Sequence, residues 1–442
     1  MSKSQAPIWH KGTQAEDWVT RFTVGDDYRW DTILLPYDIR GTRAHAWGLA
    51  QIGVLTEEER AQVSDALATL AEAVQAGEVV VTPADEDAHT VIEHHLTEVL
   101  GAVGEKIHTG RSRNDQVLAA LRLFLREQLV ARAKQVAALV EALCTLGERH
   151  AGDVMPGYTH LQRAMPSTAG LWAMGFAETL LSDLDALRHA TRQVNVSPLG
   201  SAAGYGVPHL ALPRQAVAER LGFRSVQTHV TAVQLSRGKL EAHALHALVQ
   251  VAATVNRLAS DLVLFNTAEF GFVELPAAYC TGSSIMPQKQ NPDVLELARA
   301  TYHRILAERQ TLDTLPANLP SGYHRDLQLT KEAAMRAVLL AGDLLTATVR
   351  VVEGLRFRPE RMQAACTPEL FATHQALEQV TQGVPFRAAY RDVGKAGGAP
   401  SIDPQVALEA YATDGTPGHL RIDDVRDTLA AHREWMAAAR AA

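Results

Sequence analysis

The feature that most constrains the fold of this chain is the stretch from Arg111 to Leu146, which contains neither glycine nor proline. Apolar residues such as Val117, Leu121 and Leu125 recur along it at the spacing of one helix face. At ~1.5 Å per residue, a single helix of this length spans roughly 50 Å. The sequence therefore predicts a helix much longer than those of most globular domains.

Four further long helices are predicted over residues 167–195, 228–270, 292–313 and 326–354. Single glycines such as Gly170, Gly238 and Gly342 interrupt them, and no alternating strand pattern competes with them. Five helices of this length favour an all-α fold built on a long bundle.

Shorter helical segments flank this bundle. Thr56 and Glu59 form a capping-box pattern that opens a predicted helix over 56–77, and a second helix is expected over 89–100. Prolines and glycines punctuate the chain after Gly354. We therefore predict three domains: an N-terminal helical domain (1–110), a central long-helix bundle (111–365) and a small C-terminal helical domain (366–442).

The segment 228–270 carries apolar residues around more than one face of its predicted helix. Such a wide stripe cannot be covered by one neighbouring helix. We expect subunits to associate through the bundle. The alternative is a monomer in which this helix is surrounded by its own chain.

The charge balance excludes several classes of protein. The 442 residues carry a formal net charge of −8, which argues against a nucleic-acid binder or a membrane-surface protein. Cys144, Cys280 and Cys366 lie far apart, so they predict neither a disulfide framework nor a zinc site. The first residues lack an apolar signal segment. We expect a cytoplasmic protein.

The loop over 281–293 has the composition of a loop that takes part in binding or catalysis. Gly282, Ser283 and Ser284 give it a flexible start rich in hydrogen-bonding groups, and Lys289 adds an isolated positive charge before Asn291. The alternative is a polar linker in which Asn291 only caps the next helix.

Three other polar loops lie near the ends of predicted long helices. The segment 108–116 contains two arginines at a helix start, which suits a carboxylate or phosphate, but it also fits a flexible turn. The segment 155–162 contains Thr159 and His160, and an isolated histidine is more often a surface residue. In 320–331, Gln328 and Lys331 share a helix face, unless the lysine is simply solvated. Asp87 and His89 either line a cleft or cap a helix.

Together these four segments resemble the argininosuccinate lyases, and the similarity covers most of residues 20–355. The loop 282–293 alone is shared across the fumarase/aspartase superfamily. The other three segments are more selective. The resemblance implies a homotetramer with a twenty-helix core, five helices from each chain, and four active sites that each combine three chains.

It also implies a reaction: the reversible elimination of argininosuccinate to L-arginine and fumarate, the last step of arginine biosynthesis, without metal or organic cofactor. Such an elimination removes a proton next to a carboxylate and forms an aci-carboxylate, which needs preorganised cations and N–H donors. By family correspondence, the catalytic residues are Ser283 as base, Lys289 as charge stabiliser, and His160 paired with Glu296. The corresponding substrate-binding residues are Arg113, Asn114, Thr159, Asn291, Tyr323, Arg325, Gln328 and Lys331.

The chain departs from the family pattern in places. Gln290 stands where a second basic residue is common, and the opening segment 18–27 lacks the usual glycines and serine. One alternative is another fumarate-releasing lyase of the superfamily, such as adenylosuccinate lyase. A second is a catalytically silent, crystallin-like structural protein.

Overall fold

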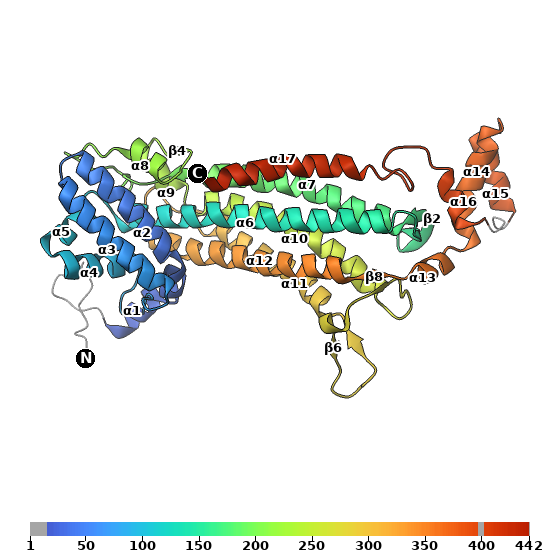
Figure 1. Cartoon of the computed structure of the whole chain (residues 1–442), viewed down its shortest axis with the longest axis horizontal. Coiled ribbons are helices and arrows are strands. Elements are labelled where there is room, and N and C mark those ends of the chain that lie inside the picture. The colour runs from blue at the N-terminus through green and yellow to red at the C-terminus, as the bar shows by residue number, and fades with distance from the viewer. Residues whose placement is uncertain (1–15, 397–401, 442) are drawn as a thin grey trace.

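The helices that correspond to the five predicted long segments lie along the longest axis of the molecule and form its central body (Figure 1). The computed structural model describes residues 16–396 and 402–441. The start of the predicted N-terminal domain and the segment around Pro400 therefore lie outside the described residues. The five helices are α6 (Arg113–Arg149), α7 (Ala169–Val194), α10 (Lys239–Phe265), α11 (Asp293–Thr314) and α12 (Thr330–Gly354). This arrangement confirms the predicted all-α bundle.

The ends of these helices differ from prediction in two places. The predicted helix 228–270 is divided into α9 (Val230–Leu235) and α10, because Gly238 adopts a positive φ of 77° between them. The segment before α12 forms a short 3₁₀ helix, η3 (Arg325–Leu329). Both irregular junctions lie near the candidate site described below.

The apolar residues of the long helix α10 are covered mainly by neighbours from its own chain, whereas one polar face with His243, His246 and Gln250 is exposed. The helix packs against α7, α11 and α12, and Leu245, Leu248 and Val255 are fully buried. Contacts within one chain are therefore enough to explain the wide apolar stripe of this helix, as in the alternative of a monomer. The stripe gives no separate reason to expect subunit association. The segment Val230–Phe265 is long and apolar enough to cross a membrane, but most of its apolar window is buried in the bundle.

The N-terminal helices pack around a separate hydrophobic core at one end of the bundle (Figure 1). The predicted capping box is confirmed: the backbone N–H of Glu59 donates to Thr56 Oγ1 at 3.1 Å, and that of Thr56 to Glu59 Oε2 at 3.0 Å. Helix α2 was missed by the sequence analysis, and it contains Pro36. The elements are α1 (Asp17–Val24), α2 (Asp27–Gln51), α3 (Glu57–Gln75), α4 (Ala88–Leu100), α5 (Ala102–Glu105) and η1 (Lys106–His108).

Short strands join the helices, and the sequence analysis predicted none of them. Strands β1 (Val154–Thr159) and β2 (Gln162–Thr168) form an antiparallel hairpin, with Thr159 opposite Gln162. The other pairs are β3 (Val196–Ser197) with β4 (Ser225–Val226), β5 (Val273–Glu274) with β8 (Arg356–Phe357), and β6 (Thr281–Gly282) with β7 (Gln290–Asn291). Two further short helices are α8 (Arg214–Arg220) and η2 (Ala277–Tyr279).

The C-terminal region divides between two places (Figure 1). Helices α13 (Pro359–Ala364), η4 (Pro368–Phe371), α14 (Ala372–Thr381), α15 (Phe386–Lys395) and α16 (Pro404–Glu409) lie beyond the far end of the bundle. Helix α17 (Ile422–Ala441) returns along the bundle against α6 and α7. The fully buried Leu429 and the ion pair of Arg426 with Glu148 fix it there. The three-domain division stays a prediction, but α17 packs with the bundle.

Candidate active site

A pocket lies where the N-terminal helices meet the starts of α6 and α12. Six of the twelve predicted site residues line it: Arg113, Asn114, Tyr323, Arg325, Gln328 and Lys331. Two polar loops that are distant in sequence, 108–116 and 320–331, therefore meet at one place. The pocket is also lined by Asp87 and His89, which the sequence left ambiguous, and by Asp27, Asp31, Glu86 and Arg237, which the sequence analysis did not propose as site residues.

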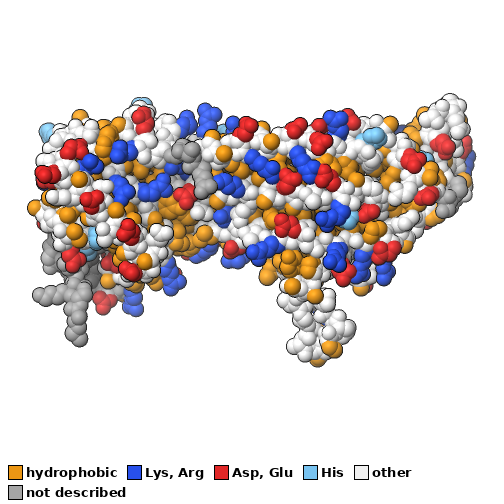
Figure 2. Space-filling view, viewed as in Figure 1, with side chains coloured by type: hydrophobic (Ala, Val, Ile, Leu, Met, Phe, Trp, Pro, Cys, Tyr) orange, Lys and Arg blue, Asp and Glu red, His pale blue; other side chains and the backbone are white. Residues whose placement is uncertain are grey.

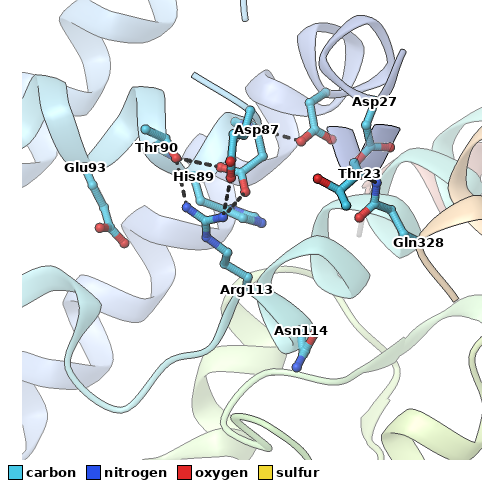
Figure 3. A network of polar contacts seen from close by, with 12 residues as sticks. Thr23, Asp27, Asp87, His89, Thr90, Glu93, Arg113, Asn114 and Gln328 are labelled. Atoms are coloured by element: carbon cyan, nitrogen blue, oxygen red, sulfur yellow. Dashed lines mark hydrogen bonds and ion pairs between the residues drawn. The ribbon is translucent and has the colours of Figure 1, made fainter. Parts of the chain in front are cut away.

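Arg113 reaches the pocket from the first turn of α6 (Figure 3). Its Nη1 lies 3.2 Å from Glu86 Oε2 and 3.1 Å from Asp87 Oδ2, and its Nη2 donates to Thr90 Oγ1 at 3.1 Å. The N-cap of α6 is Ser112, whose Oγ accepts from the backbone N–H of Asn114 at 3.3 Å. Because Ser112 caps the helix, the Asn114 side chain is left to line the pocket.

Lys331 is held between two carboxylates on α2. Its Nζ lies 2.5 Å from Asp31 Oδ1 and 2.8 Å from Asp27 Oδ2, and the residue is almost fully buried. Burial alone would lower the pKa of Lys331, but the charges of Asp31 and Asp27 raise it above its usual value. Burial raises the pKa of Asp27 to about 6, although Lys331 opposes that shift. The lysine is therefore a fixed cation at the pocket wall.

The loop 320–331 is tied to the end of α1. Arg325 Nη2 and Gln328 Nε2 each donate to the backbone oxygen of Thr23 at 3.0 Å, and Figure 3 shows Gln328 beside Thr23. The guanidinium of Arg237 lies 5.0 Å from the ring centroid of Tyr323. These contacts place amide, phenol and guanidinium groups on one side of the pocket.

Asp87 and His89, which the sequence left ambiguous, lie in the pocket as well as at a helix start. Asp87 is the N-cap of α4 and accepts from the backbone N–H of Thr90 at 2.9 Å. His89 Nδ1 pairs with Asp38. Burial acts to lower the pKa of His89, but Asp38, then Asp87 and Asp31, raise it to about 9. Both interpretations of Asp87 hold at once, and His89 contributes a buried positive charge.

The pocket presents positive and negative groups in close alternation. In the structure these groups pair with one another. A ligand that carries both carboxylates and a guanidinium could replace those pairs with its own. Among residues 16–396 and 402–441, no group of three His, Cys, Asp or Glu side chains is arranged to hold a metal ion.

The loop that carries Ser283 and Lys289 lies away from this pocket. Strands β6 and β7 pair at its base, and the loop projects from the side of the bundle (Figures 1 and 2). Within it, the backbone N–H groups of Ile285 and Met286 lie 3.3 Å and 3.1 Å from Ser283 Oγ. Ser283 Oγ therefore accepts from two N–H donors, a geometry that stabilises negative charge on an oxygen. Lys289 is exposed, and Asn291 lies in β7 instead of capping α11.

His160 lies in the turn of the β1–β2 hairpin. Figure 1 shows this hairpin at the end of the bundle opposite to the N-terminal helices. His160 and Leu161 have φ values of 53° and 58°, which are uncommon for residues other than glycine and fit the turn of a two-residue hairpin. Thr159 and His160 are exposed. Within the described part of one chain, no hydrogen bond or ion pair joins His160 to Glu296 on α11.

The sequence matches the family described as Lyase over residues 16–307. It is 47% identical over 426 residues to an argininosuccinate lyase of Sorangium cellulosum, covering 96% of this chain and 99% of that protein. An argininosuccinate lyase of Thermotoga neapolitana is 41% identical, covering 88% of this chain and 97% of that protein. The fold is similar to EDDS lyase in complex with formate, with a TM-score of 0.79, 26% identity, and coverage of 97% of this chain and 93% of that one.

Proposed function

The chain belongs to the argininosuccinate lyase family, and from this premise we propose how its residues carry out the reversible elimination of argininosuccinate to L-arginine and fumarate. The observation that carries the reaction is the likeness to argininosuccinate lyases over nearly the whole chain. The pocket supports the choice of substrate, since it offers cations for carboxylates and carboxylates for a guanidinium group.

Ser283 removes the proton from the carbon next to a carboxylate of the substrate. The N–H groups of Ile285 and Met286 support this role, because they stabilise the serine oxygen when it carries negative charge. Lys289 stabilises the aci-carboxylate that forms, and Asn291 binds a substrate carboxylate. Closure of the projecting loop over the substrate excludes water.

His160, oriented by Glu296, delivers a proton to the leaving guanidino nitrogen. The substrate is bound by Arg113, Asn114, Thr159, Tyr323, Arg325, Gln328 and Lys331. The pocket residues would separate the two ends of the substrate, with the arginine part near the carboxylates and the succinate part near the cations.

The active site is shared between chains in a homotetramer with a twenty-helix core. Support for this comes from the distribution of the catalytic groups. In one chain the pocket is lined by the N-terminal helices and the starts of α6 and α12. The Ser283 loop projects from the side of the bundle, and the β1–β2 hairpin that carries His160 lies at the end opposite to the N-terminal helices (Figure 1). Groups that must act on one small molecule are thus too dispersed to do so within one chain, and different protomers must bring them together. The cytoplasm is the proposed location.

The experiment that tests the reaction is incubation of the purified protein with argininosuccinate while the ultraviolet absorbance of fumarate is followed. Release of fumarate together with arginine is the expected result. Adenylosuccinate serves as the comparison substrate. Release of fumarate from adenylosuccinate alone would point to another lyase of the superfamily. Release of no fumarate from either substrate would favour the alternative of a structural protein.

A further inference from the structure

A cluster of three buried charged side chains lies directly behind the pocket wall. Arg122 comes from α6, Arg237 from the turn before α10, and Glu241 from the first turn of α10. Their exposed fractions are 0%, 5% and 0%. Charged residues are rarely buried to this extent unless they are paired. Of the three, Arg237 is the one that lines the pocket.

Arg122 is fixed by several hydrogen bonds. Its Nη1 donates to the backbone oxygen of Val196 and to Gln227 Oε1, both at 3.0 Å, and its Nη2 donates to Ser236 Oγ at 2.7 Å. Ser236 immediately precedes Arg237. Arg122 therefore holds the turn from which Arg237 extends, and its own position does not depend on Glu241.

Arg237 and Glu241 are held much less firmly by hydrogen bonds. Arg237 stacks over Tyr323, but its Nε and Nη1 are buried without a hydrogen-bond partner in the protein. Glu241 lies near the backbone N–H groups of Gly238 and of its own residue, yet neither carboxylate oxygen reaches hydrogen-bond geometry with a protein group. The amides of Gln116 and Gln234 and the hydroxyl of Ser201 share this property. Buried polar groups gathered in this way are the usual setting for ordered internal water.

The electrostatic balance of the cluster depends on Glu241. Burial lowers the pKa values of Arg122 and Arg237. The charge of Glu241 acts against that shift in both, and at Arg237 so do Tyr323 and Asp27. Burial likewise raises the pKa of Glu241, and the two arginines oppose it. Glu241 is thus the buried carboxylate whose charge acts on both arginines. Removing that carboxylate leaves two like charges facing each other in a medium of low polarity.

We propose that Glu241 is a positioning residue for Arg237. Its carboxylate acts through its charge and through internal water, without a direct hydrogen bond to Arg237. It keeps the Arg237 guanidinium against Tyr323 at the pocket wall, where the guanidinium meets a carboxylate of the ligand. Glu241 does not touch the substrate. Without its charge, Arg237 turns away from Arg122 and leaves the position that binds the ligand. This inference rests on the proposed function, since it takes argininosuccinate as the ligand.

The test is a double-mutant cycle with Glu241→Gln, Arg237→Gln and the double variant. Glu241→Gln should raise KM for argininosuccinate about tenfold with a smaller change in kcat, because a ground-state binding contact is lost. Arg237→Gln should raise KM at least as much. The double variant should be no worse than Arg237→Gln alone, because Glu241 acts through that arginine.

Additive effects of the two substitutions would overturn the proposal, as would an unchanged KM in Glu241→Gln. Asp183→Asn is the matched control: Asp183 is a buried carboxylate on α7 that accepts from Thr254 Oγ1 at 2.7 Å and does not line the pocket. That variant should leave KM unchanged. If Glu241→Gln does not fold, Glu241→Asp takes its place in the cycle. The shorter aspartate side chain keeps the charge but moves it away from Arg237. A smaller rise in KM is then expected.

A binding measurement separates this inference from the proposed function. Succinate carries two carboxylates, and its binding can be measured by calorimetry without turnover. The Kd for succinate should follow the same pattern as KM. Each single variant should bind succinate about tenfold more weakly, and the double variant should show no further loss. Failure of the wild-type protein to release fumarate would contradict the proposed function, while equal succinate affinity in wild type and Glu241→Gln would contradict the positioning role.

Discussion

At the scale of single residues, Ser283 has a local environment that its neighbour Ser284 lacks. The backbone N–H groups of Ile285 and Met286 point at Ser283 Oγ. A serine hydroxyl is a weak base in water, so these donors are a condition for the proposed role. The loop closes on itself through β6 and β7, which keeps this geometry while the tip remains exposed.

We therefore expect Ser283→Ala to lower kcat by at least about 10³-fold, because the general base is lost. The variant should keep the assembly size of the wild type, since Ser283 lies in a projecting loop. Ser284→Ala is the matched control and should keep most of the activity. The fumarate assay and light scattering are the measurements. Near-normal turnover in Ser283→Ala would remove this residue from the mechanism.

Asp27 gives a prediction about pH. The folded chain raises the pKa of Asp27 from 3.8 to about 6, so it keeps a proton that the unfolded chain loses near pH 3.8. The stability from this group is complete below about pH 3.8 and is lost as the pH rises through 6. Asp27→Asn should therefore increase Tm relative to wild type by a few degrees at pH 8 and by much less at pH 5.

Asp26→Asn is the control for this effect, because Asp26 is exposed and forms a surface pair with Arg29 at 3.4 Å. Thermal unfolding at both pH values measures the difference. Lys331 retains Asp31 at 2.5 Å in the Asp27 variant, so its positive charge stays compensated. A loss of stability in Asp27→Asn at pH 8 would show that the ion pair with Lys331 outweighs the burial of the carboxylate.

At the scale of elements, the close approach of helices α6 and α7 depends on small residues. Gly170, in the first turn of α7, faces the end of α6. A Cβ added there would lie 2.7 Å from both the backbone oxygen of Gly147 and Ala151 Cα. This contact fixes where the β1–β2 hairpin leaves the bundle, because the hairpin connects these two helices.

Gly170→Ala should lower the free energy of unfolding by about 1–3 kcal/mol, because the backbone of α6 has to move. Gly175 lies on the same helix with no atom within 4 Å of an added Cβ. Gly175→Ala should be neutral or stabilising by about 0.5–1 kcal/mol, since alanine favours helix. Denaturant unfolding of both variants is the measurement, and equal stability of the two would contradict the role of the close approach.

At the scale of the whole molecule, the N-terminal helices that line the pocket, the Ser283 loop and the hairpin that carries His160 lie in different parts of one chain (Figure 1). If protomers combine to complete each site, a defect in the loop and a defect in the pocket can be compensated between chains. The relevant pair is Ser283→Ala in the loop and Arg113→Ala in the pocket.

Each of these variants should be nearly inactive alone. Mixed after partial unfolding and reassembly, they should regain part of the wild-type activity, because some sites then receive both native residues from different chains. Each variant reassembled alone is the control. No recovery in mixtures that contain both chains would contradict shared active sites, and a monomer mass by light scattering would contradict the tetramer.

The sequence determined the long helices and the chemistry of the polar loops. Helical hydrogen bonds join residues four apart, so the pattern around Leu121 or the capping box at Thr56 can be read locally. The family resemblance supplied Ser283, His160 and the binding residues from motifs alone. These parts of the prediction depended on short segments of chain.

The tertiary structure decided what depends on distant contacts. Helix α2 forms in spite of Pro36 because it packs against α3 and α6, and α17 returns to the bundle through Leu429 and Arg426. The meeting of Asp27, Asp31 and Asp87 with Lys331 and Arg113 joins four separate segments. No local pattern marks such residues as neighbours, since burial and charge pairing arise only when the helices pack. The separation of Ser283 from that pocket within one chain was likewise visible only in three dimensions.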